Sequence, residues 1–204
     1  MVRTDTAFWS TIGANFGLAL VRTGMVREPP NHCPRCGTRL SPIDPPGRFH
    51  CPDCDGPVFY NPSPTARVAV VDGRSILLVK VDVSDRNLWG TPGGFVEAGE
   101  DPDVAAVREL EEETTLVADA EELVLFDARS FPKFGTMHKT YLSYALDASD
   151  VRGSPKADHE VADSRYWTPT EFDVVEDRLL TSWPETFNDL EWWIDRAHAA
   201  LDRS

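Results

Sequence analysis

The feature that most constrains this chain is a glycine-rich loop that leads directly into a well-marked helix. The loop starts at Gly93-Gly94, and the helix is predicted to span Pro102 to about Thr114. Asp101 is a suitable N-cap, and proline fits the first helical position, where its missing N–H needs no partner. Because adjacent glycines allow a close backbone approach, this loop can offer its carbonyls to a metal ion.

The helix carries three glutamates on one side. At about 100° per residue, Glu109, Glu112 and Glu113 fall within an arc of roughly 100°. The opposite side is apolar and is expected to face a core; it carries Val104, Val107 and Leu110. Hard oxygen ligands at this density suit Mg²⁺ or Mn²⁺.

A simple solvated acidic face is the alternative interpretation, since runs of charge usually lie in solvent. Three neighbouring features favour a metal site instead. The glycine pair precedes the helix, the loop holds two more acids, Glu97 and Glu100, and a single arginine, Arg108, stands beside the glutamates.

The whole segment resembles the Nudix box, G-x5-E-x7-R-E-U-x-E-E-x-G-U, in which U is apolar. The residues that match at the right spacing are Gly94, Glu100, Arg108, Glu109, Leu110, Glu112, Glu113 and Leu116. One position departs, because Thr115 stands where the family has glycine. A β-branched residue is costly at positive φ, so the turn after the helix is expected to differ. The resemblance implies a Nudix α/β/α sandwich with a mixed sheet.

The resemblance also implies roles for the site residues. The groups implied to bind one or more divalent ions are the carboxylates of Glu109, Glu112 and Glu113 and the carbonyl of Gly93. Glu100 and Arg108 are implied to hold this array, Arg108 through charge-assisted hydrogen bonds. Glu160 resembles the family's later acid and is a candidate further ligand or general base, with exposed loop charge as the equal alternative.

The implied reaction is hydrolysis of the pyrophosphate bond in a nucleoside diphosphate linked to another group, which releases a nucleoside monophosphate. NAD(H), ADP-ribose and FAD all stay open as substrates. Phe131 and Phe134 are candidates to stack on a base, although buried strand aromatics are commoner; Glu97 is a third candidate contact. The rival interpretation, motivated by Thr115, is an inactive Nudix module that binds ADP-ribose or a dinucleotide as a sensor.

The four cysteines form two C-x-x-C pairs separated by 14 residues. The pairs are Cys33 with Cys36 and Cys51 with Cys54. Four thiolates so spaced can enclose one tetrahedral Zn²⁺, with a short hairpin between the pairs and no open position for substrate. Two disulfides or an Fe–S site are the competing interpretations, and the neighbouring His32 and His50 are expected to be bystanders. Such a ribbon is similar to that of Nudix enzymes of the NADH pyrophosphatase type.

Three segments follow from these patterns. Residues 1–30 are expected to be an N-terminal helical segment, because Phe8, Ile12, Phe16 and Leu20 recur every fourth position. Residues 31–62 are expected to form the zinc ribbon, and residues 63–204 the Nudix domain. Within that domain, the predicted strands cover 66–71, 76–81, 123–129, 136–146 and 165–167, and a closing helix covers 185–201.

The net charge of −14 over 204 residues limits the partners. Such a surface repels polyphosphate backbones, which disfavours nucleic acid other than an NAD-capped RNA substrate. Abundant aspartate with little lysine predicts a halophilic protein, with an ordinary acidic protein as the alternative. No apolar stretch approaches 18 residues, so we expect a cytoplasmic protein without a membrane span. Many Nudix enzymes are dimers, which makes a homodimer a further expectation.

Overall fold

The computed structural model describes residues 29–43, 47–81, 88–133, 137–158, 161–175, 178–179 and 189–203; at 132–133, 137 and 178 it describes the backbone alone. The contacts divide the chain into two units. One unit comprises the residues up to Ser63 together with Ser130–Lys139, and the other comprises Pro64–Arg129 and Thr140–Ser204. The expected N-terminal helix lies outside the described residues and stays a prediction, as do the three expected segment boundaries.

A mixed sheet forms the centre of the second unit. The described strands of this sheet are β4 (Ser63–Asp72), β5 (Ser75–Val81), β6 (Leu88–Gly90), β7 (Gly93–Phe95), β8 (Val124–Lys133), β9 (Met137–Asp147), β10 (Val161–Trp167) and β11 (Arg178–Leu179). The order is β11-β6-β5-β4-β9-β8, with β10 also paired to β5 and β7 to β4. β11 runs parallel to β6, whereas β5 is antiparallel to β4, β6 and β10.

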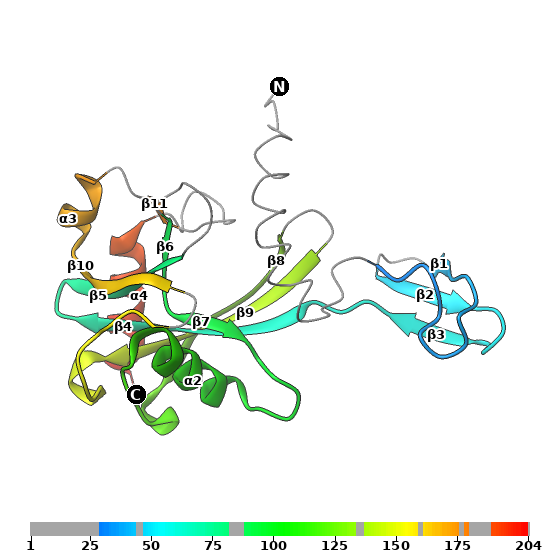
Figure 1. Cartoon of the computed structure of the whole chain (residues 1–204), viewed down its shortest axis with the longest axis horizontal. Helices are drawn as coiled ribbons and strands as arrows, with labels where there is room; N and C mark the ends of the chain where they lie inside the picture. The colour runs from blue at the N-terminus through cyan, green and yellow to red at the C-terminus, as the bar shows by residue number, and fades with distance from the viewer. Residues whose placement is uncertain are drawn as a thin grey trace. The chain divides into compact units, whose positions relative to one another are not determined.

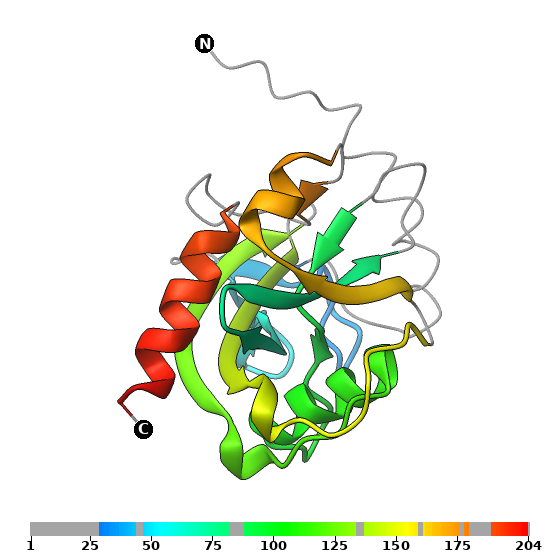
Figure 2. The ribbon, with the colours of Figure 1, turned by 90° about the vertical axis from the view of Figure 1, so that its left-hand side faces the viewer.

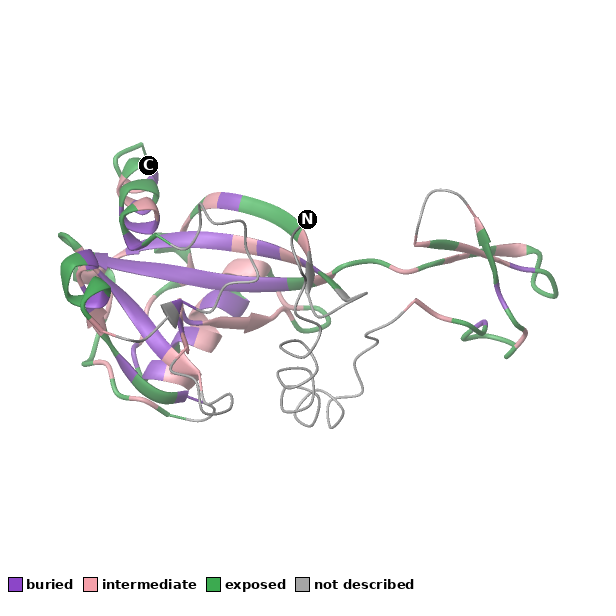
Figure 3. Ribbon diagram, turned by 90° about the horizontal axis from the view of Figure 1, so that it is seen from above, coloured by how far each residue is buried: buried purple, intermediate pink, exposed green. Residues whose placement is uncertain are grey.

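Two helices cover opposite faces of this sheet, α2 (Pro102–Thr114) and α4 (Leu190–Leu201) (Figures 1 and 2). Successive side chains of a strand point to opposite faces. Accordingly Val68 and Val70 of β4 pack with Leu110 of α2, while Ala69 and Val71 pack in the cluster that α4 completes. Residues 66–71 are all buried (Figure 3), as a strand covered on both faces must be. The expected α/β/α sandwich is confirmed.

The cysteine-bearing segment forms a separate small sheet. Its strands are β1 (Ser41–Ile43), β2 (Arg48–Cys51) and β3 (Gly56–Phe59), all antiparallel in the order β1-β2-β3. Phe49 and Val58 lie opposite each other on one face, where they pack against buried Cys33, Leu40 and Cys51. This core is small, so a bound metal has much to contribute to its stability.

In the second unit, most of the predicted elements are present. The helix has the expected bounds, Pro102–Thr114, and the hairpin expected at Asp72-Gly73 joins β4 to β5 through a glycine with φ +55°. The strands β8 and β10 are longer than predicted, whereas β9 has the predicted length and is shifted by one residue; the short strands β6, β7 and β11 were not predicted. The short helices η1 (Ala120–Glu122), η2 (Ala148–Asp150) and α3 (Pro169–Asp173) were not predicted. Among the described helices, none has the length and apolar character needed to cross a bilayer.

Candidate active site and zinc centre

The ends of α2 are fixed by local sequence. Asp101 occupies the N-cap position in an extended conformation, and Pro102 follows it, although the Asp101 side chain makes no capping hydrogen bond. At the other end, Thr115 adopts the left-handed conformation with φ +61°, and its N–H donates to the Glu111 carbonyl at 2.8 Å. The family's glycine turn is therefore kept here with a β-branched residue, which corrects the expectation of a different turn.

The helix packs through small residues. Its buried side chains are Ala105, Ala106, Leu110 and Thr114. Leu110 faces the core as predicted, but Val104 is 46% exposed, so that part of the expected apolar face was wrong. The buried side chains therefore lie on the side of α2 that also carries Glu109 and Glu113, and Val104 lies on the other side.

Glu109 lies directly over Gly94. An added Cβ at Gly94 would come within 2.5 Å of Glu109 Oε2 and nearer still to the rest of the carboxylate. Gly94 has no positive φ, so close approach, and not backbone conformation, requires glycine at this position. The side chain of Glu109 is only 17% exposed.

Glu113 is held by the neighbouring glycine. The N–H of Gly93 donates to Glu113 Oε2 at 3.0 Å. Gly93 has φ +153° and pairs with Arg67 of β4, and an added Cβ would lie 2.5 Å from the Ala66 carbonyl oxygen. The two glycines of β7 thus position two of the three candidate metal-binding carboxylates.

Arg108 connects three acids, Glu100, Glu109 and Glu112. It donates from Nε and Nη2 to both oxygens of Glu100, at 2.8 and 3.1 Å. Nη1 donates to Glu109 Oε1 at 2.9 Å and to Glu112 Oε2 at 3.0 Å. Nη2 also donates to the Phe95 carbonyl at 3.0 Å. These five bonds match the five donors of a guanidinium, so every donor of Arg108 is engaged.

The pKa values of Glu100 and Glu109 shift in opposite directions. The hydrogen bonds from Arg108 lower the pKa of Glu100. Burial raises the pKa of Glu109, and Arg108 offsets only part of that effect. The same hydrogen bonds with Glu100 raise the pKa of Arg108, so the guanidinium stays charged at any working pH.

The chemistry of these donors fits a divalent cation. Four carboxylates, from Glu100, Glu109, Glu112 and Glu113, surround one guanidinium, which leaves about three negative charges uncompensated. The carboxylates do not converge on one point: within the described residues, the only group of three or more ligand atoms close enough for one ion comes from the cysteines. One oxygen of each of Glu109, Glu112 and Glu113 accepts a hydrogen bond, from Arg108 or from the Gly93 amide.

The remaining predicted site residues are Glu97, Phe131, Phe134 and Glu160. Glu97 is exposed, and its N–H donates to Glu100 Oε2 at 3.0 Å. Phe131 is half-buried in β8, while Phe134 and Glu160 lie outside the described residues. Their substrate and base roles stay predictions. The segment before Glu160 does reach α2, because the Asp158 N–H donates to the Glu113 carbonyl at 3.2 Å.

The sequence did not predict a role for Arg67, which pairs with Gly93 of β7, the glycine strand. Arg67 is 9% exposed in the middle of β4 and stands opposite Gly93. A lone arginine in the apolar run Ala66–Val71 was the available signal, since such residues are rarely buried without a specific partner.

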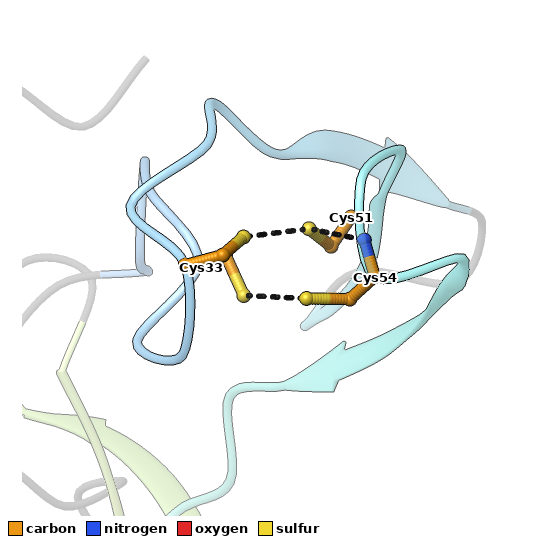
Figure 4. A group of neighbouring side chains, drawn as sticks. Cys33, Cys51 and Cys54 are labelled. Atoms are coloured by element: carbon orange, nitrogen blue, oxygen red, sulfur yellow. Dashed lines mark hydrogen bonds between the residues drawn. The ribbon is translucent and has the colours of Figure 1, made fainter.

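The four cysteine sulfurs form a compact group. Their ligand atoms all lie within 4.8 Å of one another, and Figure 4 shows Cys33, Cys51 and Cys54 turned toward a common centre. The Sγ–Sγ distances are 4.0 Å from Cys33 to Cys54 and 3.4 Å from Cys36 to Cys51. These are too long for disulfides and bracket the edge of about 3.8 Å that a ZnS₄ tetrahedron requires. The β1–β2 hairpin returns the second pair to the first, as predicted.

The comparisons with known proteins agree with this geometry. The model of the NUDIX domain family matches residues 62–188. The NAD-capped RNA hydrolase NudC of Pseudomonas aeruginosa is 36% identical over 81 residues, which are 40% of this chain and 29% of the relative. The CMP-5'-(N-acetyl-N-hydroxy-3-aminopropyl)phosphonate hydrolase of Streptomyces rubellomurinus is 33% identical over 115 residues, 54% of this chain and 53% of that protein. The chain therefore spans about half or less of these relatives.

Solved structures share the fold at low sequence identity. A NUDIX hydrolase from Nitrosomonas europaea superposes with a TM-score of 0.55 at 18% identity, covering 71% of this chain and 96% of that one. A MutT NUDIX hydrolase from Burkholderia pseudomallei gives 0.52 at 19% identity, covering 67% and 98%. At such identities the likeness extends to the fold alone.

Proposed function

The chain belongs to the Nudix family, and from this premise we propose that it is a pyrophosphohydrolase dependent on Mg²⁺ or Mn²⁺. Its substrate would be a nucleoside diphosphate linked to a second moiety, of the NAD(H), ADP-ribose or FAD type, and a nucleoside monophosphate would be released. The observation that carries the proposal is the seating of Glu109 and Glu113 on the Gly93-Gly94 strand.

Each of the site residues would have its own role. Glu109, Glu112 and Glu113, with the Gly93 carbonyl, would hold the divalent ion, while Glu100 fixes Arg108 and Arg108 fixes the glutamates. A bound Mg²⁺ or Mn²⁺ supplies charge neutralisation of the diphosphate and lowers the pKa of a coordinated water. Glu160 is the proposed further ligand or base. Phe131, Phe134 and Glu97 are proposed to contact the substrate.

The relatives support the substrate class without selecting a member of it. One acts on NAD-capped RNA and the other on a CMP-linked phosphonate, so both names describe a nucleotide joined to another group. NAD-capped RNA therefore belongs in the set of substrates to be tested. We propose Zn²⁺ for the ribbon, because four sulfurs close the shell and leave no position for substrate.

The test is a substrate panel with a matched pair of variants. NADH, NAD, ADP-ribose, FAD and NAD-capped RNA are incubated with Mg²⁺ or Mn²⁺ at low and molar salt, and the monophosphate product is quantified. Glu112→Gln is expected to lower kcat by several orders of magnitude. Glu111→Gln is the control, because Glu111 is exposed on the same helix and is expected to keep full activity.

An inactive Nudix module that serves as a sensor would give a different result with this panel. Tight binding of ADP-ribose without product in any condition, unchanged by Glu112→Gln, would overturn the enzyme proposal. Gel filtration over a range of protein concentrations tests the proposed homodimer separately, and activity that rises with salt would support the halophilic interpretation.

A further inference from the structure

Arg67 is a buried cation on the face of the sheet opposite α2. Its guanidinium carbon lies 4.6 Å from the ring centre of Tyr141 and 4.7 Å from that of Trp193, so two aromatic rings clamp it. Nε donates to Ser143 Oγ at 3.0 Å. The clamp therefore joins β4 to β9, through Tyr141 and Ser143, and to α4, through Trp193.

Holding a charge at this position has a cost that an apolar residue would avoid. Burial lowers the pKa of Arg67 to about 9, and attraction by Tyr141 and Asp127 offsets only part of that effect. Asp127 itself accepts a hydrogen bond from Arg129 Nε at 2.9 Å. If packing were the only requirement, an apolar residue of similar length would serve as well or better.

What distinguishes Arg67 is its contact with the glycine strand. It pairs with Gly93, and an added Cβ at Gly93 would lie 2.6 Å from Arg67 Cα. The space between the two backbones is too small for a side chain at Gly93, so we expect a displacement of Arg67 to move Gly93 as well. Gly93 in turn donates to Glu113 at 3.0 Å, and the next residue, Gly94, supports Glu109.

We propose that Arg67 is a positioning residue for the candidate active site. Its aromatic clamp fixes β4 against β9 and α4, and through the tight pairing with Gly93 it fixes the amide that holds Glu113. Arg67 touches neither substrate nor metal in this scheme. The inference rests on the proposed function for its effect on rate, but its effect on the Gly93–Glu113 hydrogen bond is independent of any activity.

The experiment compares Arg67→Met with Ile194→Ala in the full chain. Methionine keeps the length of the side chain without its planar charge, so thermal stability is expected to be unchanged or raised. Hydrogen exchange of the Gly93 amide is expected to accelerate at least tenfold, and kcat to fall at least tenfold with KM altered by less than threefold. Ile194 is 5% exposed in α4 and packs in the hydrophobic cluster that contains Ala69 and Val71, so Ile194→Ala should lower stability yet leave Gly93 exchange and kcat unchanged below its melting range.

A second variant pair tests whether Arg67 acts through Glu113. In a Glu113→Gln background, Arg67→Met should lower kcat no further, because the positioned group is already lost. Additive losses would overturn the proposal, as would Arg67→Met with native Gly93 exchange. If the wild-type chain hydrolyses nothing in the substrate panel, the proposed function fails, and Gly93 exchange in Arg67→Met still decides the positioning role by itself.

Discussion

Substituting alanine for Gly94 adds one methyl group at the point where the structure has least room. Gly94 has no positive φ, so the substitution introduces no backbone strain. The new Cβ would lie 2.5 Å from Glu109 Oε2 and closer to the other atoms of that carboxylate. Steric displacement of Glu109 is therefore the main expected consequence of the substitution.

The size of the effect follows from that distance. Ordinary van der Waals contact begins near 3.4 Å, so the carboxylate must retreat by about 1 Å. Misplacement of a catalytic group by about 1 Å costs roughly 100-fold in rate, or about 2.7 kcal/mol in the barrier. We expect kcat of Gly94→Ala to fall by about that factor while substrate KM changes little.

Three variants assayed by monophosphate release complete this experiment. Gly56→Ala is the control for a glycine substitution, because its Cβ would meet only the Cys54 carbonyl oxygen at 3.7 Å, and it should keep the wild-type rate. Combining Gly94→Ala with Glu109→Asp withdraws the carboxylate by about 1.5 Å; this removes the clash but misplaces the same group, so kcat should not rise above that of Gly94→Ala. A Gly94→Ala enzyme with full kcat would refute the reasoning, since Glu109 would not need the position it has here.

Three more predictions concern stability. Thr115→Gly relieves a β-branched residue at φ +61° and should stabilise the fold by about 1 kcal/mol, raising Tm by a few degrees in calorimetry; a lowered Tm would contradict it. Cys51→Ser should abolish stoichiometric zinc by metal analysis and, because zinc contributes about 10 kcal/mol to such units, remove the dispersed NMR signals of the ribbon. The persistence of these signals would count against a structural metal. Arg108 lowers the pKa of Glu100, so Glu100 stabilises the fold above the usual carboxyl pKa, and this contribution disappears as the pH falls through its lowered value. The difference in unfolding free energy between wild type and Glu100→Gln should therefore shrink on acidification, and a difference independent of pH would exclude this linkage.

Local sequence signals correctly predicted the bounds of α2 and the grouping of the four cysteines. The start of α2 is encoded by Asp101-Pro102, and the arrangement of Arg108 among the acids follows from the one-face spacing of the glutamates. The cysteine spacing likewise predicted the β1–β2 hairpin. These features depend on residues close in the chain, where periodicity and capping dominate.

Features that depend on tertiary packing were not predictable. Val104 was expected in the core, yet the small side chains of Ala105 and Ala106 decide which face approaches the sheet. The burial of Arg67 depends on Trp193, which is far away in the sequence. Thr115 was expected to alter a turn, but the backbone keeps the left-handed conformation because its N–H caps the helix.

The two candidate metal sites differ in their relation to folding. The ribbon has few buried residues, and the four sulfurs, including Cys33 and Cys51, converge on one point, so the metal itself would supply much of the unit's stability. The glutamate array rests on a full sandwich core, and Arg108 already provides a counter-charge for Glu109 and Glu112. That array can therefore be folded before a divalent ion arrives. A chelator should unfold the cysteine-bearing sheet while leaving the Gly93 amide of the second unit protected.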